Sequence, residues 1–198
     1  ADHIPTDLAD PESVAHFSDK ANALIGEQGL DALVNNAAQS PKTSYQERLG
    51  CLNGDLDGWR VVFELNFFAA LTLSRAFAGA LHRANGAIVN ITSIAGGLPL
   101  SRALGYSNGK AATDSFTRWL AVHMATTYAP QIRVNAIAPG FMITEQNRFL
   151  LEDAQTGDLT ARGETVLQNV PMSRFGKPEE IVGAALWLLS DNATFVTG

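Results

Sequence analysis

The sequence predicts an α/β fold built on a doubly wound parallel sheet, with helices on both faces in three layers. Three short apolar runs, at residues 31–38, 86–93 and 132–140, contain the expected strands. Each run is nearly continuous in apolar residues rather than alternating, which is typical of parallel strands covered on both faces. The stretches between the runs are long enough for crossover helices.

The helices expected between and after these strands differ in how much of their surface is apolar. Residues 59–83 are apolar nearly all round, so a helix there is expected to be buried against the sheet and against another subunit. A helix is also expected over 106–128, and residues 177–190 predict the last one. One stripe of the helix at 106–128 is formed by Ala112, Phe116, Leu120 and His123.

The segment after the third strand has a different composition. Residues 141–170 are polar and interrupted by glycine, which indicates a substrate lid over a ligand. No repeat or linker divides the sequence, so residues 1–198 are expected to form a single domain. A dinucleotide-binding fold normally opens on a strand, a glycine loop and a helix. No early glycine-rich turn is present, and a further strand is expected after 195–198, so the domain is expected to be incomplete at both ends.

Composition and charge narrow the class of function. The chain has 198 residues, 46% hydrophobic and 17% charged, with a net charge of −6. This acidic balance offers no basic stripe, so we expect a small-molecule ligand and neither nucleic acid nor a membrane as partner. Cys51 is the only cysteine, and no apolar run reaches the length of a membrane span. A cytoplasmic location is the default expectation.

Tyr106 and Lys110 are four residues apart, at the opening turns of an expected helix. Residues with this spacing share one helical face, so the ammonium is expected to lie beside the phenol and favour its ionised form. Free tyrosine, with a pKa of about 10, is a poor base near neutrality, and a cation at about 4 Å offers up to about 4 kcal/mol of correction. Such pairs are also common on solvated helix surfaces, so the interpretation depends on neighbouring residues.

Ser93 and Asn66 supply that context. Ser93 ends the second apolar run, at the carboxyl end of an expected strand, where open α/β sheets place ligands. Asn66 lies within the apolar segment 59–83, and a buried amide without a partner costs about 1 to 3 kcal/mol. Asn66 is therefore expected to make either a structural or a functional hydrogen bond.

Together these residues resemble the short-chain dehydrogenase/reductase family over nearly the whole sequence. The resemblance implies a Rossmann-like oxidoreductase domain without its N-terminal glycine-loop unit and last strand. One departure is Ala38, where the family usually has glycine. The motifs that carry the resemblance are Asp7-Leu8, Asn35-Asn36-Ala37-Ala38, Asn66, Ser93, Tyr106 with Lys110, and Pro139-Gly140 followed by Thr144.

The resemblance implies four catalytic residues. Tyr106 would be the general acid in reduction and the general base in oxidation, with Lys110 favouring its ionised form. Ser93 would hydrogen-bond the substrate oxygen, and Asn66 would hold a water that links Lys110 to solvent.

The resemblance also implies an NAD or NADP site. Lys110 would bind the nicotinamide ribose, and Met142 and Thr144 the carboxamide. The preference between the two cofactors stays open, because the residue that meets the adenosine 2′ position lies outside these 198 residues. Without the phosphate contacts of the glycine loop, the 198 residues alone are expected to be inactive. The full set implied in cofactor binding is Asp7 and Leu8 at the adenine, Asn35 and Ala37 at the adenosine side, and Tyr106, Lys110, Pro139, Gly140, Met142 and Thr144.

Substrate choice is expected to come from the lid. Residues 138–151 and 171–198 look like the branch of the family that oxidises D-mannonate or reduces D-fructuronate, which implies a sugar acid. A guanidinium suits a carboxylate and amides suit hydroxyls, so the residues expected to bind substrate in the lid are Arg148 with Gln146 and Asn147. Arg148 as a solvated helix residue is the alternative. Another carbonyl substrate, such as a 3-oxoacyl thioester or a neutral sugar, and a non-catalytic relative are the alternative functions.

No metal site is expected, because the four histidines lie far apart in the sequence without the spacing of metal ligands. Two long helices, at 59–83 and 106–128, match the family's pairing surfaces, so a homotetramer or homodimer is expected. The tryptophans at 59, 119 and 187 are expected in the core or in subunit packing. Asp55 or Asp57 is expected to cap the helix that begins near Trp59.

Overall fold

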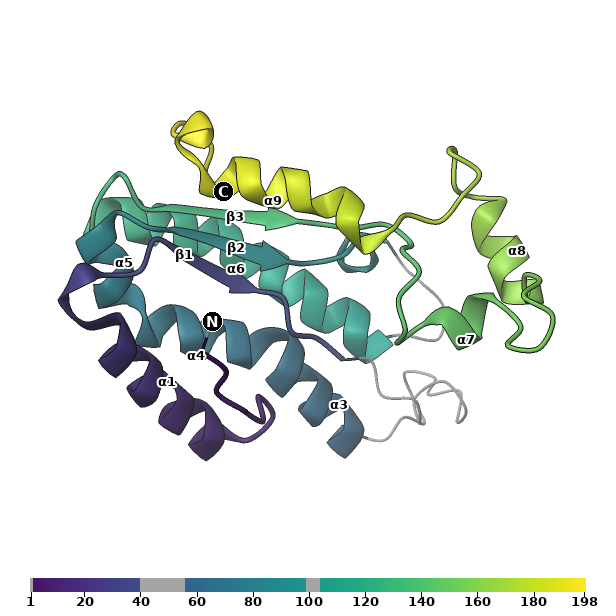
Figure 1. Cartoon of the computed structure of the whole chain (residues 1–198), viewed down its shortest axis with the longest axis horizontal. Coiled ribbons are helices and arrows are strands. Elements are labelled where there is room, and N and C mark those ends of the chain that lie inside the picture. Colours follow the sequence, from purple (N-terminus) through teal and green to yellow (C-terminus); the bar gives the residue numbers. More distant parts are fainter. Residues whose placement is uncertain (1, 40–55, 99–103) are drawn as a thin grey trace. The chain divides into compact units, whose positions relative to one another are not determined.

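The computed structural model describes residues 2–39, 56–98 and 104–198, and its sheet has three parallel strands in the order β1-β2-β3. They are β1 (Ala32–Asn35), β2 (Ala87–Ile91) and β3 (Arg133–Ile137) (Figure 1). Each strand lies inside one of the predicted apolar runs. The register pairs Val34 with Val89 and Val89 with Asn135. The Rossmann-like α/β fold predicted from the sequence is confirmed.

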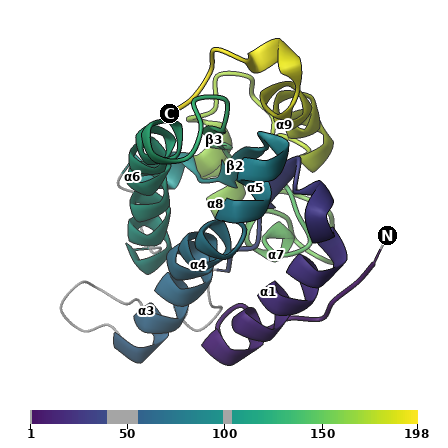
Figure 2. The ribbon, with the colours of Figure 1, turned by 90° about the vertical axis from the view of Figure 1, so that its left-hand side faces the viewer.

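Helices α1 (Pro11–Ile25), α4 (Ala69–Ala76) and α6 (Leu104–Thr127) lie side by side on one face of this sheet (Figures 1 and 2). No helix was predicted at the position of α1, although residues typical of a helix N-terminus are present there. Asp10 caps the helix by accepting from the backbone N–H of Glu12, and Pro11 is the first helical residue. Helix α6 agrees closely with the segment predicted at 106–128.

The single helix predicted over 59–83 is wrong in one respect, because the segment is interrupted twice. Helix α3 (Leu56–Phe63) leads into a π-helical turn at Glu64–Phe68, and α4 follows. Phe77, with φ −100° and ψ 2°, then ends α4, and α5 (Ala78–Ala84) leaves at an angle of 55°. An all-round apolar sequence marks burial but gives no signal of where a helix bends.

No single helix in the described ranges is long and apolar enough to cross a membrane. The bent pair Leu56–Ala76 and Ala78–Ala84 passes that test by length and composition only. Its side chains at Leu73, Phe77 and Leu81 are packed in the protein's own core.

The core lies between the sheet and the helices on that face. Leu81, Ile88, Ile132 and Val134 are fully buried there. The stripe of α6 that faces the core includes Phe116 and Leu120 as predicted, but its next member is Met124 rather than His123. Met124 continues the spacing of four residues, whereas His123 points aside and stacks on Trp119 with ring centroids 4.8 Å apart.

The chain divides into two compact units. The first is Ala1–Ala138 with Trp187–Gly198, and the second is Pro139–Leu186. The second unit contains α7 (Arg148–Leu151) and α8 (Ala161–Leu167), so it includes the whole segment predicted as a lid. An isolated β-bridge between Met142 and Gly176 connects two distant segments of this unit. The role of the segment as a lid stays a prediction.

The boundary between the units falls within α9 (Val182–Leu189), which follows a short 3₁₀ turn at Pro178–Ile181. Residues 177–190 therefore hold one short turn and one helix instead of a continuous helix. The last turn of α9 belongs to the first unit, where the buried guanidinium of Arg133 donates to the carbonyls of Leu188 and Ser190. A buried cation at a helix C-terminus satisfies carbonyls that have no partner within the helix.

Candidate active site

Lys110 is the most deeply buried charged side chain of the predicted site, with 3% of its surface exposed. It lies on α6, and its Nζ donates to the carbonyl of Ile91, the last residue of β2, at 2.6 Å. Burial lowers the pKa of Lys110 from 10.5 to about 8. Because that value is above 7, the ammonium stays mostly protonated at neutral pH. The fold therefore holds a positive charge at the carboxyl end of the central strand.

Tyr106 lies one helical turn before Lys110 and is half-buried. The Lys110 Nζ is 5.8 Å from the centroid of the tyrosine ring. The sequence spacing thus brings the ammonium and the phenol side chain together, as a shared helical face requires.

Ser93 follows β2 and starts a 3₁₀ turn at Ile94–Gly96 by accepting from the backbone N–H of Ala95 at 3.1 Å. This turn is pressed against α6. A Cβ built on Gly96 would lie 3.0 Å from the backbone nitrogen of Ala111, so no larger residue fits without movement. The close approach holds the segment of Ser93 against the helix that carries Tyr106 and Lys110.

Asn66 lies in the π-helical turn and is 3% exposed. Its side-chain Nδ2 donates to the carbonyls of Gln39 at 2.8 Å and Val62 at 2.9 Å. Its Oδ1 is buried and has no hydrogen-bond partner among the described residues. The structural role expected for Asn66 is therefore observed at its Nδ2, and the functional role stays a prediction.

A cavity of about 80 Å³ connects two of these residues, Asn66 and Lys110, with part of the predicted cofactor site, and neither Ser93 nor Tyr106 lines it. Asn66 and Lys110 line it together with Leu8, Asn35 and Ala37, which come from the segment before α1 and from the end of β1. The structure thus gathers five of the predicted residues, from four separate segments, at one cavity.

Two of the predicted adenosine-side residues make structural contacts. Asp7 accepts from the backbone N–H of Ala9 at 2.9 Å and donates its own N–H to Ser13 at 2.9 Å, which shapes the loop before α1. Asn35 donates to Oδ1 of Asn90 at 2.8 Å, and its own Oδ1 is buried without a partner in the described part of the chain.

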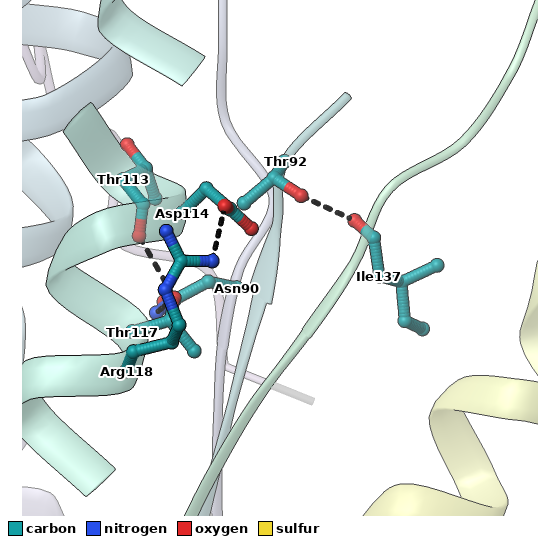
Figure 3. A network of polar contacts seen from close by, with 7 residues as sticks. All are labelled: Asn90, Thr92, Thr113, Asp114, Thr117, Arg118 and Ile137. Atoms are coloured by element: carbon teal, nitrogen blue, oxygen red, sulfur yellow. Dashed lines mark hydrogen bonds and ion pairs between the residues drawn. The ribbon is translucent and has the colours of Figure 1, made fainter. Parts of the chain in front are cut away.

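Asn90 connects Asn35 to α6 through a buried network that was not predicted from the sequence. Figure 3 shows Asn90 with Thr113 and Thr117 of that helix. Asn90 Nδ2 donates to Thr117 Oγ1 at 2.9 Å, and Thr117 Oγ1 donates to the carbonyl of Thr113 at 2.8 Å. Asn90 is fully buried and Thr117 is 2% exposed. The available signal was an asparagine inside an apolar strand, since a buried amide requires partners.

The remaining predicted residues lie in the second unit, where a turn is held by Asn147. Its Oδ1 accepts from the backbone N–H of Thr144 at 2.8 Å, and its Nδ2 donates to the carbonyl of Met142 at 2.7 Å. Arg148 is paired with Glu152 one turn along α7, and Gln146 is exposed. Pro139 and Gly140 begin the unit. The amide of Asn147 is thus engaged within the turn, and Arg148 already has a carboxylate neighbour.

Three further predictions concern residues outside this group. In the described ranges no three His, Cys, Asp or Glu side chains are placed to hold a metal ion. Trp119 and Trp187 are 61% and 46% exposed, so they are not core residues of this chain. Asp57 lies inside the first turn of α3 and pairs with Arg60, while Asp55 and Cys51 lie outside the described residues.

Known proteins resemble this chain along its whole length. A family model described as enoyl-(acyl carrier protein) reductase matches residues 1–198. An uncharacterized oxidoreductase, UxuB, of Bacillus subtilis (strain 168) is 39% identical over 187 residues, which cover 88% of this chain and 66% of that protein. The chain spans between 50% and 66% of the length of this and two other curated relatives that it matches.

Two solved structures share the fold. A candidate D-mannonate oxidoreductase from Haemophilus influenzae with bound NAD has a TM-score of 0.83 at 32% identity, over 97% of this chain and 71% of that one. A gluconate 5-dehydrogenase from Burkholderia cenocepacia J2315, in complex with NADP and tartrate, has a TM-score of 0.81 at 28% identity, over 96% and 69%.

Proposed function

This chain belongs to the short-chain dehydrogenase/reductase family, and from that membership we propose that the full-length protein is an NAD(P)-dependent oxidoreductase. It transfers a hydride between the nicotinamide and a carbonyl or secondary alcohol. The observation that carries the proposal is the buried Lys110 ammonium, which lies beside the Tyr106 ring at the carboxyl end of β2. A buried ionisable side chain with a perturbed pKa in a cavity is a candidate for a functional group.

Each residue of the site has a chemical task in this proposal. Tyr106 gives its hydroxyl proton to the substrate oxygen in reduction and takes it back in oxidation. The positive charge of Lys110 stabilises the phenolate that forms between these events. Ser93 donates a hydrogen bond to the substrate oxygen as charge develops there. Asn66 holds a water that links Lys110 to solvent, and both residues line the same cavity.

The residues at the cavity fit a bound dinucleotide. NAD or NADP, when bound, supplies or accepts the hydride. Two buried amide oxygens, on Asn35 and Asn66, lack partners in the described ranges, and both residues line the cavity. Leu8 and Ala37 line the same cavity. Met142 and Thr144, which the family resemblance assigns to the carboxamide, lie in the turn that Asn147 stabilises. Asp7, Pro139 and Gly140 complete the cofactor residues of the proposal.

The proposed substrate is a sugar acid of the D-mannonate or D-fructuronate type. Support comes from the two solved relatives, one described as a D-mannonate oxidoreductase and one as a gluconate 5-dehydrogenase. On this chain, Arg148 would bind the carboxylate and Gln146 a hydroxyl. Asn147 serves substrate only through the turn that it holds, because its amide is already engaged.

An acyl thioester is the second candidate substrate, since the matching family model is described as enoyl-(acyl carrier protein) reductase. A screen separates the two. The full-length protein is mixed with NAD or NADP and a panel of hexonates, hexuronates and acyl thioesters, and the absorbance of reduced nicotinamide is followed. Turnover of thioesters alone would exclude the sugar-acid proposal, and no turnover with any carbonyl or alcohol would favour a non-catalytic relative.

Tyr106→Phe is the decisive variant for the proposed chemistry, because it removes only the hydroxyl. We expect kcat to fall by at least about a hundredfold, the contribution typical of a general acid–base group. Tyr128→Phe, at the exposed end of the same helix, is the matched control and should leave kcat unchanged. Equal rates for both variants would remove Tyr106 from the mechanism.

Pairing of subunits is part of the proposal. Val122 on the outer face of α6 is 65% exposed and Trp119 is 61% exposed, while Val61 on α3 is 45% exposed. Exposed apolar side chains on neighbouring helices favour a homotetramer or homodimer that covers them. Light scattering of Val122→Glu should show a smaller particle than the parent protein, and an unchanged mass would exclude this surface.

A further inference from the structure

The acidic partner of Arg148 is held in place by the backbone around it. Glu152 directly follows α7, and its N–H donates to the carbonyl of Arg148 at 2.9 Å. It also forms an isolated antiparallel β-bridge with Leu159. Between these two residues the chain turns back on itself, because the N–H of Asp153 donates to the carbonyl of Asp158 at 2.8 Å. The backbone of Glu152 is therefore fixed where the short helix ends.

Helix α8 packs against the same point. The backbone N–H of Thr160 donates to the carbonyl of Leu151 at 3.0 Å, and its Oγ1 donates to the carbonyl of Leu150 at 2.7 Å. A Cβ built on Gly163 would lie 2.2 Å from the carbonyl oxygen of Leu151, so the two helices approach as closely as glycine allows. Leu151 directly precedes Glu152 and is 2% exposed, so it is fixed by both helices.

The ion pair between Arg148 and Glu152 is unequally exposed. Nη1 of Arg148 lies 2.5 Å from Oε2 of Glu152, and the two side chains are 58% and 25% exposed. Among the four ion pairs in the described ranges, Glu152 is the least exposed acidic partner. An ion pair is strengthened as the water around it is reduced. Glu152 therefore engages one nitrogen of the guanidinium, while more than half of the arginine side chain stays accessible to a ligand.

We propose that Glu152 is a specificity-determining residue, which competes with the carboxylate of the substrate for the guanidinium of Arg148. A guanidinium binds a carboxylate through two parallel N–H donors, and Glu152 already engages one of the nitrogens that carry them. A second carboxylate at Arg148 is also repelled by the negative charge of Glu152. A neutral sugar meets neither effect. Glu152 thus lowers the preference for an acidic ligand over a neutral one, and this inference rests on the sugar-acid substrate of the proposed function.

Glu152→Gln tests this role, because it removes the negative charge and keeps the size of the side chain. In the full-length enzyme we expect the KM for D-mannonate to fall about threefold, the scale of one accessible ion pair. The KM for D-mannitol, a neutral analogue, should stay the same, and the change for D-mannonate should appear in KM rather than in kcat. The fall in KM should shrink as the ionic strength rises, because salt screens charges at an accessible site.

Two further variants complete the test. Glu179→Gln removes one negative charge from the same unit, outside α7 and α8, and is the matched control for that loss. Arg148→Ala removes the cation for which the two carboxylates compete, so in that background Glu152→Gln should have a smaller effect on the KM for D-mannonate. A purely structural ion pair would change the melting temperature of Glu152→Gln and leave the ratio of the two KM values as it is in the parent.

An unchanged KM for D-mannonate in Glu152→Gln, or an equal fall for D-mannitol, would overturn the role of Glu152. Calorimetric titration with D-mannonate gives a second readout that needs no turnover, because NADH or NADPH is present and an alcohol cannot react with the reduced cofactor. Glu152→Gln should bind D-mannonate more tightly than the parent. A parent enzyme that turned over no sugar acid would defeat the proposed substrate. The titration would still decide the inference, since equal binding by the two proteins, or none by either, would contradict it.

Discussion

Lys110→Met replaces the buried ammonium with an apolar side chain of similar length, and its effect on stability should depend on pH. The pKa of Lys110 is lowered by burial from 10.5 to about 8 in the folded chain. Below pH 8 the lysine is protonated in both states, so the folded state bears the full penalty of a buried charge. Between pH 8 and 10.5 the unfolded state binds more protons than the folded state, so the free energy of unfolding rises with pH.

The magnitude follows from those two values. The difference between 10.5 and about 8, at about 1.4 kcal/mol per pH unit, corresponds to about 3 kcal/mol. The parent protein should gain this stability relative to Lys110→Met between pH 8 and 10.5. At pH 7 the variant has no buried charge and so avoids that desolvation cost. It also leaves the carbonyl of Ile91 without the donor that lies 2.6 Å away, which costs about 1 to 3 kcal/mol. The two proteins should therefore have similar stability at pH 7.

Urea unfolding followed by circular dichroism, from pH 7 to 10.5, measures the difference between the two proteins. Subtracting the variant from the parent cancels the titration of all groups that they share. Lys20→Met, at an exposed position of α1, is the matched control for replacing a lysine outside the site. A difference between parent and Lys110→Met that stays constant across this range would refute the reasoning, because it would show that the ammonium is well solvated when folded.

Arg148→Ala should raise the KM for an acidic sugar and spare a neutral analogue, and equal effects in steady-state kinetics would remove Arg148 from the substrate site. Glu180→Gln should lower the melting temperature above pH 4.5, and the difference from the parent should shrink as the pH falls to 2. The hydrogen bond from Arg174 lowers the pKa of Glu180 from 4.5 to about 2, and that stabilisation is lost as the carboxylate is protonated. Gly86→Ala should lower the unfolding free energy in urea by at least about 2 kcal/mol, because its Cβ would lie 2.1 Å from the carbonyl of Leu30.

Matched variants control the last two experiments. Glu179→Gln removes a neighbouring carboxylate on the same short turn and is the matched control for the loss of one negative charge. Gly183→Ala adds a methyl group in α9 where no atom lies within 4 Å, so it should not destabilise the protein. If Gly86→Ala and Gly183→Ala had the same unfolding free energy in urea, that result would contradict the close contact at Gly86.

The strands were predictable because their signal is local. Each apolar run in the sequence contains one observed strand, and a continuous apolar run is enough to indicate a strand that is covered on both faces. The breaks near Asn66 and at Phe77 were not predictable, since the helix around them is apolar on all sides and carries no proline. In the π-helical turn the carbonyl of Asn66 accepts a hydrogen bond from Thr113 of α6, a partner that the local sequence does not indicate.

The partners of buried polar residues were likewise not predictable from the sequence. Arg133 is buried beside the carbonyls of Leu188 and Ser190, which are more than fifty residues away in the chain. Nothing in the sequence near Arg133 indicates these partners. Asn90 could be marked as a residue that needs a partner, but only the packed helix shows that Thr117 provides one.

The sequence by itself determined the parallel α/β class and the pairing of Tyr106 with Lys110, because strand and helix periodicity act over a few neighbouring residues. The tertiary structure alone decided that Leu8, Asn35 and Asn66 meet Lys110 at one cavity. It also decided that the ammonium is buried against the end of β2. Burial and long-range hydrogen bonds depend on which segments pack together. That packing is determined by residues throughout the chain and not by the neighbours of any one residue.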